Sequence, residues 1–556
     1  MELAKRLKTE RFAEHFREGS IDFASSIAEQ VFLHPSLRGP VLRELERSVV
    51  ARANGKACPG CPDRVLQDQA DMLSAIFASA ARALDRGQIS RKALRGLLRT
   101  FLANVVLAKD RGIEHAKQRF AEKHGGALPP SFLVISPTSA CNLRCAGCYS
   151  SSGSSPQRLE WETLDRIVTE AKELWGVRFF TISGGEPLMY RSNGKRLLDL
   201  VERHHDCFFQ SYTNGCFIDR PTAERMADAG NLVPAISVEG LEPRTDARRG
   251  AGVFKRILQA MDNLRTAGVP FGISMTATRQ NAEEVLSDEL VDFFFEKQQA
   301  VFGWLFQYMP IGRGYTADLV VTPQQRLGMW ERTWRIIRER KIMLADFWNC
   351  GTVTQGCIAA GTSYLYIDWN GKVMPCVFVP YSPANIRDIY RRGGTLDDVY
   401  DLPYFQAIRR WQSDYARSDG PEGRGGNWLL PCSLRDHYAT GRELIGKYRP
   451  VPEDRSAAEA LIDQEYAGRM RAYDKDLKQV FDPVWEQEYL KAETRRSGRP
   501  GDASNYWEGE DEDPANHDSD RTVESMIGSD PGLAPVLGCQ ENLLTCRDDE
   551  GRHPHR

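Results

Sequence analysis

The chain has 556 residues, of which 41% are hydrophobic and 27% charged, a composition that indicates a globular protein and excludes a disordered or fibrous one. Its 73 lysines and arginines stand against 76 aspartates and glutamates, so the net charge of −3 indicates no nucleic-acid partner. The first twenty residues lack the apolar run of a secretory signal, and no apolar run is long enough to span a bilayer. We therefore expect a cytoplasmic protein without a membrane span.

Changes in residue pattern divide the chain into five segments. Residues 1–128 carry apolar side chains at helical spacing and predict a helical N-terminal domain. Residues 129–320 alternate short β-rich runs with helical patterns, which predicts an α/β domain. Residues 321–450 predict a small α+β domain, and residues 451–496 a charged helical extension. Residues 497–556 contain 14 acidic and 5 basic residues and predict a disordered acidic tail.

The 129–320 segment predicts six strands and five helices in alternation. The expected strands are residues 132–136, 178–182, 208–212, 232–238, 270–276 and 301–308. The expected helices are residues 159–175, 196–204, 221–229, 253–267 and 282–296. This order predicts a parallel sheet curved into a partial (β/α)6 barrel, in which chemistry takes place at the carboxyl ends of the strands.

Three cysteines follow the first expected strand in a CxxxCxxC pattern. Cys141, Cys145 and Cys148 stand on a loop rich in serine and glycine. Three thiolates can hold three corners of a [4Fe–4S] cluster and leave the fourth iron open, while a zinc site is the alternative interpretation. An odd total of 13 cysteines also favours metal or redox roles over a disulfide framework.

A CxxxCxxC loop after the first strand of a β/α barrel resembles the radical S-adenosylmethionine (SAM) superfamily. That family usually has an aromatic residue before the third cysteine, near the adenine of SAM, whereas this chain has Gly147 there and Tyr149 after the cysteine. The resemblance implies a [4Fe–4S] cluster that binds SAM through its open iron. Reduction then cleaves SAM to methionine and a 5′-deoxyadenosyl radical, which abstracts hydrogen from the substrate.

Further candidate SAM-binding residues stand at the ends of the second and third strands. The second strand ends in Gly184, Gly185 and Glu186, where the glycines allow close backbone approach and a carboxylate can take an ammonium group. In the resembling family this GGEP motif holds the amino group of the methionine moiety. The third strand ends in Thr213 and Asn214, which we also expect at this site.

The fourth strand ends in Ser237 and Glu239, whose side chains suit the hydroxyls of a ribose. Arg249 follows twelve residues after Ser237. In the resembling family this run supplies an arginine that pairs with the SAM carboxylate, a bidentate task that suits guanidinium. Arg244 and Arg248 lie nearby, and a solvated basic loop is the alternative interpretation.

Four cysteines follow the barrel, namely Cys350, Cys357, Cys376 and Cys432. The spacing C-x13-G-x4-C from Cys357 to Cys376 resembles the opening of the SPASM and twitch extensions, which carry auxiliary iron–sulfur clusters. No dense cysteine block follows, so the resemblance implies one auxiliary [4Fe–4S] cluster of twitch type. Four thiolates close such a cluster, but His437 or a substrate atom could replace Cys350, and a structural zinc ribbon remains the alternative.

These motifs predict a radical SAM enzyme that takes its electron from a low-potential donor of ferredoxin or flavodoxin type. The first expected substrate is a peptide or protein, as for many SPASM-bearing relatives. The second is a small metabolite, a cofactor precursor or a lipid. The alternative of another class is a non-catalytic iron–sulfur electron carrier or a zinc protein. The GGEP motif and Arg249 argue against this alternative.

Overall fold

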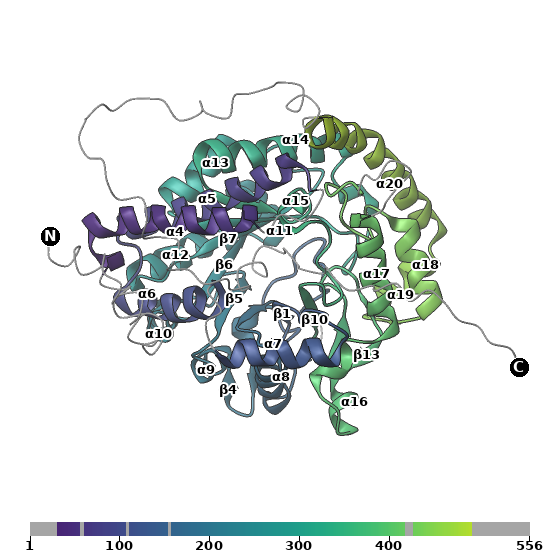
Figure 1. Ribbon diagram of the computed structural model, residues 1–556, viewed down its shortest axis with the longest axis horizontal. Coiled ribbons are helices and arrows are strands. Elements are labelled where there is room, and N and C mark those ends of the chain that lie inside the picture. The colour runs from purple at the N-terminus through teal and green to yellow at the C-terminus, as the bar shows by residue number, and fades with distance from the viewer. Residues whose placement is uncertain (1–30, 56–60, 107–110, 154–156, 418–425, 492–556) are drawn as a thin grey trace, which may run out of the picture.

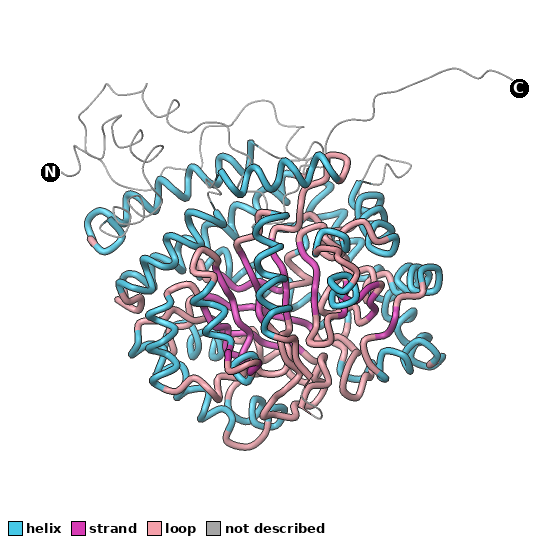
Figure 2. The backbone as a smooth tube through the Cα atoms, turned by 90° about the horizontal axis from the view of Figure 1, so that it is seen from below, coloured by secondary structure: helices cyan, strands magenta, loops and turns pink. Residues whose placement is uncertain are grey.

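The computed structural model of the chain describes residues 31–55, 61–106, 111–153, 157–417 and 426–491. The predicted acidic tail, residues 497–556, lies outside the described residues. Figure 2 shows the strands in the middle of the molecule and the helices around them. Within the described ranges, no helix is long and apolar enough to cross a membrane.

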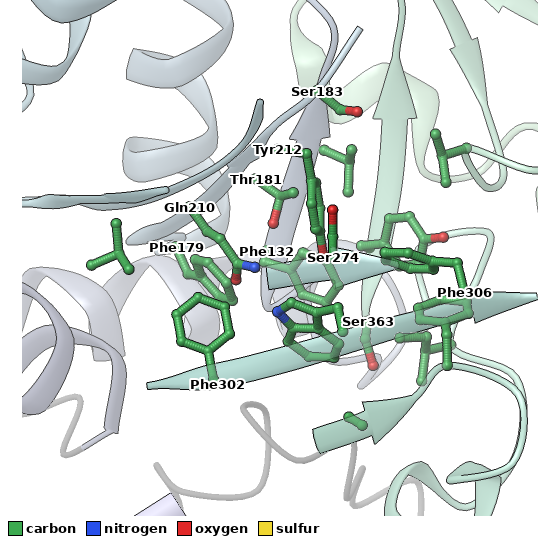
Figure 3. Close-up of a pocket in the computed structure, with 18 of the residues that line it drawn as sticks. Phe132, Phe179, Thr181, Ser183, Gln210, Tyr212, Ser274, Phe302, Phe306 and Ser363 are labelled. Carbon is green, nitrogen blue, oxygen red and sulfur yellow. The ribbon is translucent and has the colours of Figure 1, made fainter. Parts of the chain in front are cut away.

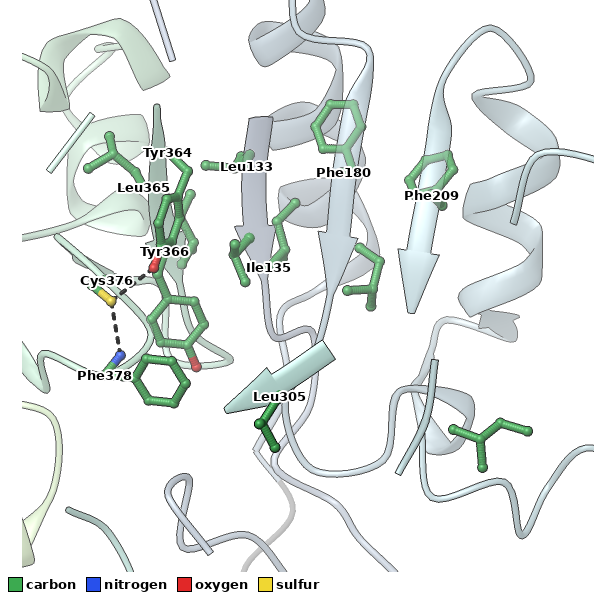
Figure 4. Packing of buried hydrophobic residues seen from close by; sticks show 14 of the residues in the cluster. Leu133, Ile135, Phe180, Phe209, Leu305, Tyr364, Leu365, Tyr366, Cys376 and Phe378 are labelled. Atoms are coloured by element: carbon green, nitrogen blue, oxygen red, sulfur yellow. Dashed lines mark hydrogen bonds between the residues drawn. The ribbon is translucent and has the colours of Figure 1, made fainter. Parts of the chain in front are cut away.

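The central sheet confirms the predicted partial barrel. Its six predicted strands pair in parallel and in chain order: β1 (Phe132–Ile135), β2 (Phe179–Ile182), β5 (Phe208–Thr213), β6 (Leu232–Val238), β7 (Gly272–Ala277) and β8 (Phe302–Gln307). The register places Leu133 beside Phe180 and Phe180 beside Phe209, and Figure 4 shows these side chains in one row. All three are buried, as expected for a sheet covered on both faces.

The helices between these strands include four that begin and end close to the predicted positions, one that begins later, and one, Glu242–Arg249, that was not predicted. They are α8 (Trp161–Trp175), α9 (Leu197–Arg203), α10 (Arg220–Ala229), α11 (Glu242–Arg249), α12 (Val253–Ala267) and α13 (Asp288–Val291), which continues as η3 (Asp292–Lys297). The prediction of a helix from residue 282 was wrong, because Ser287 caps the helix by accepting from the backbone N–H of Leu290. Residues 282–287 form turns.

The sheet continues beyond residue 320 at both edges. Strand β9 (Met343–Asp346) adds in parallel to β8, after α14 (Pro323–Arg335) and η5 (Ile336–Arg340). Strand β10 (Tyr364–Ile367) adds in parallel to β1 on the opposite edge, and β11 (Lys372–Met374) and β13 (Ala384–Asn385) follow it antiparallel. Cys350 and Cys357 therefore lie between β9 and β10, and Cys376 follows β11, whereas Cys432 lies between the helices Pro403–Arg417 and Tyr438–Tyr448.

Helices before the barrel cover the amino ends of its strands. They are α4 (Pro35–Gly55), α5 (Asp63–Asp85), α6 (Arg91–Leu97), η1 (Leu98–Val106) and α7 (Arg111–Lys123). Ser90 caps α6 by accepting from the backbone N–H of Ala93. Helix α6 touches α10 so closely that a β-carbon on Gly96 would lie 2.3 Å from the carbonyl oxygen of Gly230. Phe101 meets Phe208, the first residue of β5, with ring centroids 5.0 Å apart.

The remaining described elements lie between or after the strands and helices named above. They are η2 (Pro187–Met189), β3 (Arg191–Ser192), β4 (Lys195–Arg196), η4 (Ala317–Leu319), α15 (Gly351–Thr354), β12 (Tyr381–Ser382), α16 (Ile386–Arg391), η6 (Leu396–Val399), α17 (Pro403–Arg417), α18 (Tyr438–Tyr448), β14 (Val451–Pro452), α19 (Arg455–Ile462), α20 (Gln464–Val484) and η7 (Trp485–Leu490). Helix α20 packs on α14 and α18, along the outside of the molecule (Figure 1).

Candidate active site

The loop that follows β1 carries Cys141, Cys145 and Cys148 into the wall of a large cavity. Burial raises the pKa of the Cys141 thiol to about 11, and the neighbouring thiols of Cys145 and Cys148 add to this shift. The three thiols are therefore close enough to interact as charges. They lie at the carboxyl end of β1, where a β/α barrel places its chemistry.

Two arginines that the sequence analysis did not single out as ligands hold this cysteine loop. Arg313 donates from Nη1 to the carbonyl oxygen of Cys145 at 3.0 Å, and its backbone N–H donates to that of Cys148 at 2.9 Å. Arg248 donates from Nε to the carbonyl oxygen of Ala146 at 3.1 Å. The two guanidinium groups thus donate to backbone carbonyl oxygens that regular secondary structure does not pair in this loop.

The Gly184–Gly185 pair lets the end of β2 lie against the cysteine loop. The backbone N–H of Gly185 donates to the carbonyl oxygen of Thr138 at 2.9 Å, and that of Glu186 donates to Ala140 at 2.7 Å. A β-carbon on Gly185 would lie only 2.2 Å from the carbonyl oxygen of Ala140. Only glycine fits at this position while the two segments remain in contact.

The Glu186 carboxylate is buried behind the cavity wall and joins the second and third strand ends. It accepts from Thr213 Oγ1 at 2.7 Å, from the backbone N–H of Asn214 at 2.8 Å and from that of Leu188 at 3.1 Å. Burial raises its pKa, and these hydrogen bonds oppose the shift. Gly184, Gly185, Thr213 and Asn214 line the cavity themselves. The Asn214 amide also donates to Asn142 Oδ1 at 2.8 Å, which ties this strand end to the cysteine loop.

Glu239, at the end of β6, is paired with arginine in this structure. Its carboxylate accepts from Arg249 Nε at 2.9 Å and lies 2.6 Å from Arg248 Nη1. Burial alone would lower the pKa of Arg249, but Glu239 and the Cys145 thiol raise it. Ser237 and Arg249 both line the cavity, and Ser237 Oγ lies 3.2 Å from Ser274 Oγ.

Three of the four C-terminal cysteines form a second group of thiols. Burial raises the pKa of Cys376 to about 12 and that of Cys357 to about 11, and the Cys432 thiol adds to both shifts. Tyr364 donates its hydroxyl to Cys376 Sγ at 2.9 Å (Figure 4).

The Cys350 thiol and the His437 ring have other neighbours, although the backbone N–H of His437 donates to the carbonyl oxygen of Cys432 at 3.1 Å. The Cys350 thiol is buried in the neighbouring apolar cluster with Val353 and Trp428. Burial raises its pKa, and the nearby carboxylate of Asp346 raises it further. The His437 ring packs against Trp411 and Tyr415, and its Nε2 lies 2.9 Å from the carbonyl oxygen of Leu430.

One cavity of about 730 Å³ connects both groups of thiols. Its walls are mainly apolar and aromatic, and Figure 3 shows Phe179, Phe302 and Phe306 around it. The lining includes all seven candidate ligand cysteines, which are Cys141, Cys145, Cys148, Cys350, Cys357, Cys376 and Cys432.

Gln307 and Asp346 add a polar pair to the cavity wall. The Gln307 amide donates to both carboxylate oxygens of Asp346, at 3.1 and 3.0 Å. A carboxylate accepts only, so this contact fixes the orientation of the amide. Among the described residues, Gln307 Oε1 has no hydrogen-bond partner.

Comparison with known proteins decides the family. The profile of the Radical SAM superfamily matches residues 135–288. The mycofactocin maturase MftC of Mycolicibacterium smegmatis is 30% identical over 304 residues, which cover 52% of this chain and 74% of that protein. The chain belongs to the radical SAM superfamily.

Two further similarities concern one more protein sequence and one solved structure. The AdoMet-dependent heme synthase of Methanosarcina barkeri is 26% identical over 47% of this chain and 80% of its own length. Among solved structures, Streptococcus suis SuiB bound to the precursor peptide SuiA is 20% identical. It covers 52% of this chain and 70% of that chain, with a TM-score of 0.45.

A radical SAM enzyme uses a [4Fe–4S] cluster and SAM, and the residues at the barrel mouth fit both. The three thiols share one wall of the cavity, as the ligands of one cluster must. A cradle of glycine backbone and polar strand ends lies beside them. The second group of thiols fits an auxiliary cluster, and a buried arginine next to Cys432 has unpartnered N–H groups within the described part of the chain.

Proposed function

We propose that this radical SAM enzyme modifies a peptide, as a maturase. The observation that carries the proposal is the cavity that joins the two groups of thiols, because it gives a substrate access to both. The similarity to a mycofactocin maturase supports a peptide substrate. Gln307 adds support, since its fixed carbonyl oxygen suits an N–H group of a peptide backbone.

We assign the binding roles to residues of this chain as follows. Cys141, Cys145 and Cys148 hold the SAM cluster, and Arg313 and Arg248 keep their loop in place. The cradle for SAM is formed by Gly184, Gly185, Thr213, Asn214, Ser237 and Arg249, with Glu186 and Glu239 behind it. Cys357, Cys376 and Cys432 hold the auxiliary cluster, and its fourth position is open to Cys350, to His437 or to a substrate atom.

The cofactors, when bound, supply one-electron cleavage of SAM to a 5′-deoxyadenosyl radical that abstracts hydrogen. The protein's part is to orient the substrate and to exclude water. The apolar cavity wall serves both tasks, because it leaves the radical few neighbours other than the substrate. Glu239 keeps Arg249 beside the cysteine loop, where its charge is available to a carboxylate.

We further propose an acidic donor of ferredoxin or flavodoxin type as the source of the electron. A second hollow lies beside the cysteine loop and is lined by Arg144, Arg248, Arg249 and Arg256. Arg144 and Arg256 are exposed. A basic hollow next to the cluster-binding loop suits a negatively charged partner.

The test of the peptide proposal uses the anaerobically reconstituted enzyme with SAM, dithionite and a short peptide encoded beside its gene. Mass spectrometry should show a changed peptide mass with the wild-type enzyme and none with the Cys141/Cys145/Cys148→Ala variant. An unmodified peptide, together with 5′-deoxyadenosine formation that a porphyrin or another small molecule stimulates, would favour the metabolite alternative. That alternative is supported by the similarity to a heme synthase.

A further inference from the structure

Arg435 is a buried cation with few partners. It stands three residues after Cys432, and none of its side chain is exposed. Its Nε donates to Asp436 Oδ1 at 3.1 Å, and its guanidinium lies 4.4 Å from the centre of the Trp348 ring. Within the described ranges, Nη1 and Nη2 have no hydrogen-bond partner. Unpaired N–H groups on a buried charge are costly, so this arrangement indicates a missing acceptor.

The neighbouring Arg326, in the same core, has hydrogen-bond acceptors for its side-chain N–H groups. It is also fully buried, and it donates to Asn349 Oδ1 at 3.1 Å, to Asp436 Oδ1 at 2.7 Å and to the carbonyl oxygen of Leu429 at 2.6 Å. The single carboxylate of Asp436 therefore accepts hydrogen bonds from both arginines. The buried carboxylate of Asp346 also interacts with Arg326 as a charge, whereas Nη1 and Nη2 of Arg435 have no acceptor within the described residues.

Arg435 is connected to the second group of thiols through Asp436. The Asp436 carboxylate, to which Arg435 Nε donates, accepts from the backbone N–H of Cys432 at 3.1 Å, and the carbonyl oxygen of Cys432 accepts from the backbone N–H of Asp436 at 2.9 Å. Cys432 in turn interacts with the thiols of Cys357 and Cys376. Trp348, which Arg435 covers, lines the cavity together with these cysteines.

We propose that Arg435 is the counter-charge of the auxiliary iron–sulfur cluster. Its free N–H groups donate to the sulfur atoms of the cluster, and its charge favours the reduced state over the oxidised state. A cluster held by thiolates is an anion, and reduction by one electron makes it more negative, so a nearby fixed cation raises its reduction potential. The inference depends on the auxiliary cluster and is independent of the identity of the substrate.

The experiment measures the auxiliary cluster alone. The Cys141/Cys145/Cys148→Ala variant removes the SAM cluster, and anaerobic reconstitution then loads only the C-terminal site. Arg435→Gln removes the charge, Arg435→Lys keeps it, and Arg326→Gln is the matched control, because it removes the other arginine of Asp436. The measurements are iron content, circular dichroism and the midpoint potential from a redox titration.

The proposal predicts that Arg435→Gln shifts the midpoint potential to a more negative value, while Arg435→Lys stays near the parent value. Arg326→Gln should change the potential less than Arg435→Gln does. Equal shifts in Arg435→Gln and Arg326→Gln would assign the effect to the Asp436 pair and overturn the proposal, as would an unchanged potential in Arg435→Gln. If the folded Arg435→Gln protein loses its iron, retention of iron by Arg435→Lys supports the proposal, and loss in both variants overturns it. A parent variant that takes up no iron overturns it as well.

Discussion

The ring of Tyr308 lies against the backbone of Gly147, the residue directly before the third cysteine of the loop. A β-carbon on Gly147 would come within 2.8 Å of Tyr308 Cε2, and Gly147 has a φ of +63°. Tyr308 follows β8, so an aromatic ring from the far end of the barrel stands beside the loop position where radical SAM proteins usually carry one. The ring and the glycine are thus complementary in size.

We expect Gly147→Ala to destabilise the protein, because the new methyl group meets the Tyr308 ring and the backbone stays at positive φ. The cost should be about 1–3 kcal/mol in the free energy of unfolding, measured by denaturant titration. The cost of Gly147→Ala should be smaller in a Tyr308→Ala background than in the wild type, and unchanged in a Tyr308→Phe background. An equal cost in both backgrounds would show that the ring is not the cause.

Gly185→Ala should prevent the SAM cluster from being held, because the new β-carbon would lie 2.2 Å from a backbone oxygen of the cysteine loop. The expected result is iron content reduced to the auxiliary cluster alone, about four irons per chain. Gly446→Ala is the control, since Gly446 lies in α18 with nothing within 4 Å of its β-carbon position. Normal iron content in Gly185→Ala would contradict the assigned contact.

Arg249→Ala and Glu186→Gln should weaken SAM binding and leave the iron content unchanged. Removing one partner of a charged hydrogen bond costs about 1.5–3 kcal/mol, which corresponds to roughly tenfold to a hundredfold in affinity. Arg244→Ala is the matched control on the same helix, because Arg244 pairs with Glu284 and does not line the cavity. Equilibrium binding of SAM to the reconstituted proteins measures the effect. Unaltered affinity in both variants would remove the two residues from the site.

The basic hollow predicts a difference between two sources of electrons. The double variant Arg144→Glu/Arg256→Glu should cleave SAM more slowly with reduced flavodoxin or ferredoxin, by tenfold or more at low salt. Its rate with dithionite, a small reductant that needs no docking surface, should match that of the wild type. Rates that fall equally with both reductants would point to damage at the cluster loop.

The strands and the cysteine loop could be predicted from local pattern, and the connections between distant segments could not. Alternating β-rich and helical runs indicate the six parallel strands β1, β2 and β5 to β8, because each strand and helix carries its own periodicity. The addition of β9 and β10 to opposite edges of that sheet depends on long-range pairing, for which the sequence holds no local signal. The helix predicted from residue 282 begins at Asp288 instead, because Ser287 caps it. The apolar pattern gives no indication of this cap.

The candidate site could likewise be predicted where its signal is local, and not where it depends on contacts between distant segments. Cysteine spacing and the GGEP motif are local, and they point to the candidate cysteines and to Gly184 and Gly185, all of which line the cavity. Arg313 was not recognised because its partners are backbone carbonyl oxygens, which any sequence has. The one sequence feature that could have indicated the position of Arg313 is the GRG triplet after β8. Its first glycine, Gly312, packs against the cysteine loop, because a β-carbon there would lie 2.2 Å from the carbonyl oxygen of Tyr149. The separation of Cys350 from the other thiols also depends on tertiary packing.

The most direct test of the account is the formation of 5′-deoxyadenosine by the anaerobically reconstituted protein with SAM and dithionite. The wild type, with two cubane clusters, should contain about eight irons per chain and release 5′-deoxyadenosine. The Cys141/Cys145/Cys148→Ala variant should retain about four irons and release none. Cleavage of SAM by this variant at the wild-type rate would contradict the assignment of the active site to these three cysteines.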